Sequence, residues 1–216
     1  MNHKGAIFDM DGLLFDTEKI FQQTWNEIAD ERKIQLSADF AKAISGTSGS
    51  HMQSVIEKYY GVADGSTIQH ECIMRVAEKL KEHVPKKPGV CEILEFFKEN
   101  GFRIAVASSS TKKQIENNLE IADIRSYFDA VVSGNEVKNG KPAPDIFLYA
   151  AEKIGCKSQD CYVFEDSQNG IRAGFAAGCK AIMIPDMIAP TEEMYRLSYR
   201  IYDSLSEARN SLEKLI

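Results

Sequence analysis

Short, mostly apolar segments alternate along the chain with longer segments in which apolar residues recur at helical spacing. The apolar runs are typical of strands buried on both faces, and they cover residues 6–8, 102–107, 130–132, 161–164 and 180–184. Apolar residues three or four positions apart predict helices around residues 90–97, 115–119, 147–154 and 205–215. This alternation predicts an α/β fold with a doubly wound, mostly parallel sheet and right-handed crossovers.

One long segment lacks the alternation. Residues 16–84 carry apolar residues at helical spacing, such as Trp25 and Ile28, and read as almost entirely helical. Small residues at 45–50 predict a plain loop between two of these helices, and a loop that presses its backbone amides against a ligand is the alternative. The expected domains are a core of residues 1–15 and 88–216, with an inserted helical cap of residues 16–87.

Two carboxylates, Asp9 and Asp11, follow the first apolar run. Ligands of open α/β sheets bind at the carboxyl ends of the strands, and residues two apart in an extended segment point to the same side. Gly12 lets the backbone turn tightly or approach a ligand closely. Both carboxylates can therefore face one pocket, where Mg²⁺ would relieve their repulsion and offer a coordination position to a phosphate. A polar Asp-Gly turn is the alternative interpretation.

Further polar residues follow later strands. Ser108 and Ser109 come after the second apolar run, where hydroxyls suit a helix N-cap or a phosphate oxygen equally well. Two prolines just after Lys141 fix the backbone, which would hold this cation at a helix entrance. Glu165 and Asp166 end the fourth run and repeat the pattern of the first. An acid pair at a helix start is the alternative for these two.

The composition restricts the classes of function. A net charge of −6 argues against a general nucleic-acid or anionic-membrane surface, because such surfaces need clustered Lys and Arg. No apolar run approaches the ~20 residues that span a bilayer, and the N-terminus does not resemble a signal peptide, so we expect a cytoplasmic protein. The five scattered cysteines lack zinc spacing and are interpreted as reduced core residues. We expect a monomer that binds a small phosphorylated substrate.

Four stretches resemble, in order and spacing, the four motifs of the haloacid dehalogenase-like (HAD) hydrolase superfamily. They are residues 9–12, Ser108, residues 141–145 and residues 165–167. The resemblance is closest to the β-phosphoglucomutase-like and phosphatase branch and covers nearly the whole chain. It implies a Rossmann-like core with the first strand beside those that carry Ser108 and the second acid pair. It also implies an α-helical cap domain inserted after that strand, and Mg²⁺ as cofactor.

The resemblance also implies residue roles. Asp9 matches the nucleophile that attacks phosphorus and forms an aspartyl-phosphate, and Asp11 matches the general acid and base, with its main-chain carbonyl as a metal ligand. The implied metal ligands are Asp9, Asp11, Glu165 and Asp166, and the implied phosphate-binding residues are Ser108, Ser109 and Lys141. Asp16 and Thr17 are expected to orient Asp11 by hydrogen bonding, and a structural helix cap is the alternative.

Departures from the family pattern bear on the reaction. The dehalogenase branch lacks the second aspartate of the first motif, so Asp11 indicates phosphoryl transfer. The mutase branch has a cap histidine and a cap arginine, whereas Phe21 and Gly49 or Ser50 stand at those positions here. We therefore expect a Mg²⁺-dependent phosphomonoester hydrolase for a small phosphorylated metabolite such as a sugar phosphate. A β-phosphoglucomutase-type mutase and a non-catalytic binding or regulatory module are the alternatives.

Overall fold

The computed structural model describes residues 3–44, 47, 49–186 and 189–215. The chain divides into two compact units, one of Met1–Phe15 with Pro85–Ile216 and one of Asp16–Val84. The helical unit thus ends at residue 84, where the sequence analysis expects residue 87. Lys87 is held in the first unit because its N–H donates to the carbonyl of Leu14 (2.9 Å).

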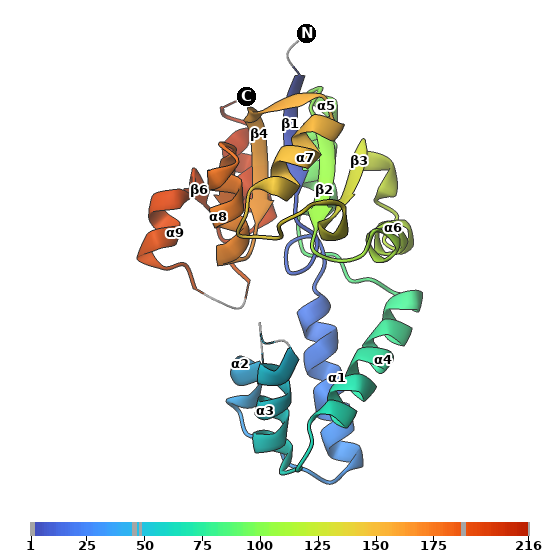
Figure 1. The fold of residues 1–216 in the computed structure, drawn as a ribbon. Helices are drawn as coiled ribbons and strands as arrows, with labels where there is room; N and C mark the ends of the chain where they lie inside the picture. The colour runs from blue at the N-terminus through green and yellow to red at the C-terminus, as the bar shows by residue number, and fades with distance from the viewer. Residues whose placement is uncertain (1–2, 45–46, 48, 187–188, 216) are drawn as a thin grey trace. The chain divides into compact units, whose positions relative to one another are not determined.

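The first unit is organised around a six-stranded sheet in the order β3-β2-β1-β4-β5-β6, in which every neighbouring pair is parallel. The strands are β1 (His3–Phe8), β2 (Arg103–Ser108), β3 (Ala130–Ser133), β4 (Cys156–Glu165), β5 (Lys180–Met183) and β6 (Arg200–Ile201). Helices cover both faces of the sheet (Figure 1). The doubly wound α/β fold expected from the alternating pattern is confirmed.

The helices of this unit connect the strands. They are α5 (Val90–Glu99), α6 (Lys112–Ile121), α7 (Asp145–Lys153), α8 (Gln168–Ala176), α9 (Glu192–Leu197) and α10 (Leu205–Leu212), with 3₁₀ turns η1 (Arg125–Tyr127) and η2 (Gly134–Glu136).

Successive residues of β1 are buried on opposite faces of the sheet. Ile7 shares an apolar core with Phe147 of α7. Phe8 stacks on Phe164 of β4, with ring centroids 4.6 Å apart, and meets Phe97 of α5 edge-on at 6.0 Å. Burial on both faces explains why this segment is continuously apolar instead of alternating.

The strand register brings polar residues to one edge of the sheet. Phe8 is paired with Phe164, and the N–H of Asp9 donates to the carbonyl of Phe164 (3.0 Å). On the other side of β1, Ser108 ends β2 directly opposite Ser133 of β3. The residues that follow β1, β2 and β4 therefore meet at the carboxyl edge.

The second unit is all-helical, as the sequence pattern predicts. Its helices are α1 (Thr17–Glu31), α2 (Phe40–Ile44), α3 (Gly49–Tyr60) and α4 (Ser66–Glu82). Trp25 meets both Phe40 and Tyr60 edge-on, and the Tyr60 hydroxyl donates to the Trp25 carbonyl (2.6 Å). An aromatic cluster therefore joins α1, α2 and α3.

The small-residue segment is only partly described. Ser45, Gly46 and Ser48 lie outside the described residues, so the loop expected there is not tested. Thr47 donates its hydroxyl to the carbonyl of Ile44 (2.6 Å), and Gly49 already begins α3. Within the described part of the chain, every helix is too short or too polar to cross a bilayer.

Three features of the core escape the sequence pattern. The sixth strand, β6, has two residues and α9 has six, so neither is long enough to show a periodicity. In addition, β4 begins at Cys156 and not at residue 161. Its first five residues alternate in burial and include four charged or polar side chains, so they do not form an apolar run.

Candidate active site

A buried ion cluster lies at the carboxyl ends of β1 and β4. The Nζ atom of Lys141 contacts Oδ1 of Asp9 and lies 2.6 Å from Oε1 of Glu165, and it donates to the Ala107 carbonyl at 3.3 Å. The side chains of Lys141, Asp9 and Glu165 are only 8%, 9% and 1% exposed. A lysine predicted to be held at a helix entrance is thus fixed between two buried carboxylates.

The charges in this cluster depend on one another. Burial by itself would lower the pKa of Lys141, but the carboxylates of Asp9 and Glu165 outweigh it and raise that pKa. Burial raises the pKa of Asp9, and Lys141 opposes that shift. The ring of Phe147 also lies 5.0 Å from the Lys141 ammonium. Lys141 is therefore a permanent cation beside the Asp9 carboxylate.

Asp11 accepts hydrogen bonds from the serines that follow β2. Its Oδ2 accepts from the hydroxyl of Ser110 at 3.0 Å and from that of Ser108 at 3.4 Å. Burial raises the pKa of Asp11, and the two hydroxyls only partly offset this shift. A raised pKa favours the protonated form of this carboxyl group, which suits a general acid.

The serine loop is supported from β3. The hydroxyl of Ser133, which is 1% exposed, donates to the carbonyl of Ser110 at 2.6 Å. A Cβ on Gly134 would lie 3.1 Å from the Cα of Ser109, so the loop packs closely on this glycine. The sequence analysis named Ser108 and Ser109 but missed Ser110 and Ser133.

Asp166 lies beside the turn after β1. Gly12 has a φ of +84°, and a Cβ there would come within 2.4 Å of Oδ2 of Asp166, so only glycine lets the two segments meet. Burial, followed by the charges of Glu165 and Asp9, raises the pKa of Asp166 to about 9. Without a bound cation, the protonated form of Asp166 is therefore favoured near neutral pH, because its surroundings do not compensate the charge of the carboxylate.

The oxygens of Glu165 are already engaged. Oε1 accepts from Lys141, while Oε2 accepts from the backbone N–H (2.9 Å) and the hydroxyl (2.8 Å) of Ser167. A Cβ on Gly170 would lie 1.8 Å from the Glu165 carboxyl group, so the glycine provides the space for it. Glu165 therefore holds Lys141 in place, and the role of metal ligand that the resemblance implies for it stays a prediction.

The remaining acids fit a hard divalent cation. Lys141 engages only Oδ1 of Asp9, and the raised pKa of Asp166 shows that this carboxylate gains from a neighbouring positive charge. Among the described residues, no three His, Cys, Asp or Glu side chains converge closely enough to hold an ion. A cation at this edge therefore needs a main-chain carbonyl, such as that of Asp11, and water to complete an octahedral shell.

Asp16 and Thr17 belong to the second unit. Asp16 precedes α1 but makes no side-chain capping hydrogen bond to it, and Thr17 is the first residue of the helix and is buried. The alternative role of a structural helix cap is therefore not supported for Asp16. The role of these two residues in orienting Asp11 stays a prediction.

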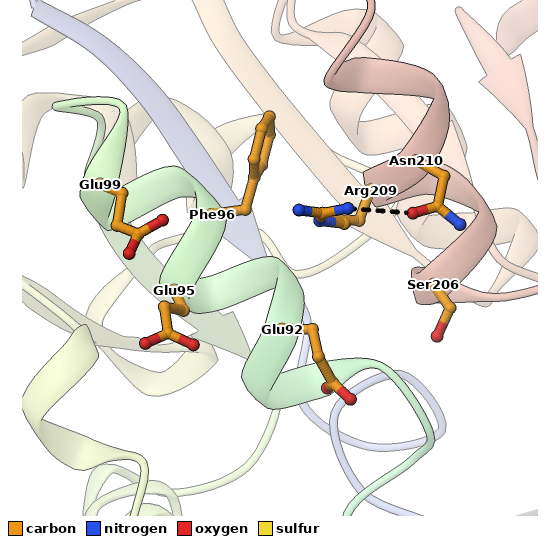
Figure 2. Close-up of a pocket in the computed structure, with 7 residues that line it drawn as sticks. All are labelled: Glu92, Glu95, Phe96, Glu99, Ser206, Arg209 and Asn210. Carbon is orange, nitrogen blue, oxygen red and sulfur yellow. Dashed lines mark hydrogen bonds between the residues drawn. The ribbon is translucent and has the colours of Figure 1, made fainter.

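A hollow of about 470 Å³ lies elsewhere, between α5 and α10. Figure 2 shows Glu92, Glu95 and Glu99 along α5 and Arg209 on α10 beside the Phe96 ring, whose centroid is 5.7 Å from the guanidinium carbon. Arg209 also donates to the Asn210 side chain at 3.1 Å. The hollow contains no group from the carboxyl edge of the sheet, so it is separate from the candidate active site.

The comparisons with known proteins identify the family of this chain. Residues 6–184 match the family model described as haloacid dehalogenase-like hydrolase. The phosphorylated carbohydrates phosphatase of Thermotoga maritima is 33% identical over 184 residues, covering 83% of each chain. The fructose-1-phosphate phosphatase of Escherichia coli is 34% identical over 182 residues, covering 83% of this chain and 95% of that protein.

The fold agrees as well. The crystal structure of a HAD family hydrolase from Deinococcus radiodurans superposes with a TM-score of 0.84 at 24% identity, over 98% of this chain and 96% of that one. The family model covers far more than half of the chain, and the relatives reach 30% identity over most of their length. The chain therefore belongs to the haloacid dehalogenase-like hydrolase family, in its phosphatase branch.

Proposed function

We propose that the protein is a Mg²⁺-dependent phosphomonoester hydrolase for a small phosphorylated carbohydrate, working through an aspartyl-phosphate on Asp9. The names of the two relatives above support a phosphorylated carbohydrate as substrate. The observation that carries the proposal is the contact of Lys141 with Asp9 at the carboxyl edge, beside Asp11. These groups are the ones that in-line transfer of a phosphoryl group to a carboxylate needs.

Asp9 attacks the phosphorus atom, and the bond from phosphorus to the ester oxygen breaks. Lys141 favours the ionised form of Asp9 and neutralises the phosphoryl oxygens, while Ser108 donates a hydrogen bond to one of them. Glu165 fixes the ammonium of Lys141 in place. Mg²⁺, held by Asp9, Asp166 and the main-chain carbonyl of Asp11, would neutralise the charge that develops on the phosphoryl group.

Asp11 protonates the leaving alcohol, because its raised pKa keeps a proton available. The same carboxylate, now deprotonated, takes a proton from the water that attacks the aspartyl-phosphate and releases phosphate. The hydroxyl of Ser110 holds its Oδ2 in position for both transfers. Asp11 thus serves both halves of the reaction.

A screen of sugar phosphates with Mg²⁺ or with EDTA tests the proposal by measuring free phosphate. We expect Mg²⁺-dependent release with the native chain and none with Asp9→Asn, which retains the shape of the side chain. Lys112→Met, a substitution at a half-exposed lysine of α6, is the matched control and should keep the native rate. Full activity of Asp9→Asn would disprove the nucleophile assignment.

The same samples separate hydrolysis from the mutase reaction. A sugar 1-phosphate supplied with a catalytic amount of the bisphosphate should give free phosphate if the protein is a phosphatase. Conversion to the 6-phosphate isomer without phosphate release would show a mutase. Binding of sugar phosphates without either product would show a non-catalytic member of the fold.

A further inference from the structure

Three of the five cysteines lie far from the catalytic groups along the strands. Cys156 begins β4, Cys161 follows five residues later, and Cys179 immediately precedes β5. Cys156 and Cys179 therefore lie at the amino ends of these strands and Cys161 lies in the middle of β4, whereas the candidate active site lies at the carboxyl ends. All three are free thiols, and no step of the proposed reaction uses them.

An irregularity in β4 brings the first two of these cysteines together. Cys156 is paired with His3 of β1, and Cys161 is paired with Gly5, so β4 uses five residues where β1 uses two. Because a parallel strand rises about 3.3 Å per residue, two residues of β1 place the two cysteine Cα atoms roughly 6.6 Å apart. Disulfides form when the Cα atoms are about 4.4–6.8 Å apart.

Gly5 provides the space in which the two thiols meet. A Cβ on Gly5 would lie 2.6 Å from Sγ of Cys161 and 3.4 Å from Sγ of Cys156. Both sulfur atoms thus lie within 3.4 Å of one point on the same face of the sheet. Any side chain at residue 5 would displace them, so the glycine and the two cysteines form one local arrangement.

The two thiols differ in access. Cys161 is completely buried, whereas Cys156 is partly exposed. Burial raises the pKa of both thiols, and each donates to a backbone carbonyl, Cys156 to that of Ile154 (3.7 Å) and Cys161 to that of Lys157 (3.3 Å). An oxidant in solution therefore reacts first with Cys156, and Cys161 then reacts with the oxidised Cys156.

We propose that Cys156 and Cys161 form a dithiol that is oxidised to a disulfide by small disulfides such as oxidised glutathione. The thiolate of Cys156 attacks one sulfur of the oxidant and releases one glutathione thiolate. The thiolate of Cys161 then attacks Sγ of Cys156 and displaces the second. The two protons lost by the cysteines are taken up by the released thiolates, so the protein loses two electrons and the oxidant gains them.

Peptide mapping of the full native chain tests this directly, because trypsin cleaves after Lys157, between the two cysteines. After incubation with oxidised glutathione and blocking of free thiols, we expect peptides 154–157 and 158–172 to be joined. Reduction should separate them. A Cys161 peptide joined instead to peptide 173–180, which contains Cys179, would overturn the proposal. So would glutathione retained on Cys156 with Cys161 free.

Two pairs of variants complete the test. Cys156→Ser and Cys161→Ala should each abolish the joined peptides, and Cys156→Ser keeps the test valid if the buried Cys161→Ala fails to fold. Cys179→Ser and Cys91→Ser are matched controls that remove a thiol outside the pair, and both should keep the joined peptides. The proposal does not depend on the phosphatase activity, so its failure leaves the proposed function in place.

Discussion

Replacement of Lys141 by methionine tests the charge balance of the active site most sharply. Methionine roughly keeps the length of the side chain but removes the cation that lies between Asp9 and Glu165 and over the Phe147 ring. Those two carboxylates are 9% and 1% exposed, so water does not replace the lost partner. Removal of one member of a buried ion pair costs about 3–5 kcal/mol of unfolding free energy. For a chain of this size that corresponds to a fall in Tm of roughly 6–20 °C.

The loss of stability in Lys141→Met should depend on pH. Without Lys141, the pKa of Asp9 in the folded state lies even further above its unfolded value, because burial and the repulsion from Glu165 are unopposed. The folded state then binds more protons than the unfolded state, so stability falls as pH rises above the unfolded pKa of about 4. We expect the difference from the native chain to be larger at pH 8 than at pH 5.

The readout has to report on the first unit. The single tryptophan, Trp25, lies in the second unit, so its fluorescence would miss the perturbation. Hydrogen exchange of amides in β1 and β4, in EDTA and across a urea series, follows the affected strands. Lys112→Met, whose lysine is 53% exposed and pairs with Glu136, should cost no more than about 1 kcal/mol. A similarly small effect of Lys141→Met would refute the buried ion cluster.

Three further predictions concern the catalytic groups. Asp11→Asn should lower kcat about 10²–10⁴-fold for an alkyl phosphate. The loss should be much smaller for an aryl phosphate, because its leaving group needs no proton. Equal losses of kcat for the two substrates would contradict the role of Asp11 as the acid. Gly12→Ala should weaken Mg²⁺ binding in calorimetry, because its Cβ would come within 2.4 Å of Asp166 Oδ2; unchanged affinity would argue against Asp166 as a ligand. Since the pKa of Asp166 is raised to about 9 without metal, Mg²⁺ must displace a proton below that pH. Apparent affinity should therefore increase from pH 6 to pH 8, and a flat profile would contradict this.

The sequence predicts the position of the site better than its contacts. Asp9, Ser108 and Glu165 come together because parallel strands end at a common edge, and apolar runs that stop at polar residues reveal such ends without any tertiary information. The hydrogen-bond partners of those residues do not follow from the positions of the strand ends. Ser133 supports the serine loop through the carbonyl of Ser110, and that contact depends on β3 being the neighbour of β2. A sequence does not contain this strand order.

A signal for Ser133 was nevertheless present. It follows the short apolar run 130–132, just as Ser108 follows the run 102–107, and the same rule applied to both would have placed both at the carboxyl edge. The contacts of the Glu165 carboxylate were harder to predict. Whether its oxygens face a metal or the protein depends on the Lys141 ammonium and the Ser167 N–H. Only the folded chain brings Lys141 within reach of it.

Glycines at two positions explain how so many acids can gather at one edge. Residues 12 and 170 are the points where a Cβ would collide with a carboxyl group, at 2.4 Å from Asp166 and 1.8 Å from Glu165. At Gly12 the positive φ of +84° disfavours other residues independently of space. The sequence therefore specifies the site in two ways, through acidic residues at the strand ends and through glycines that leave space for their side chains. Such close approach of acidic side chains would destabilise most protein surfaces. Here it lets Lys141 contact Asp9 and Glu165 at the same time, while Asp166 remains available to a divalent cation.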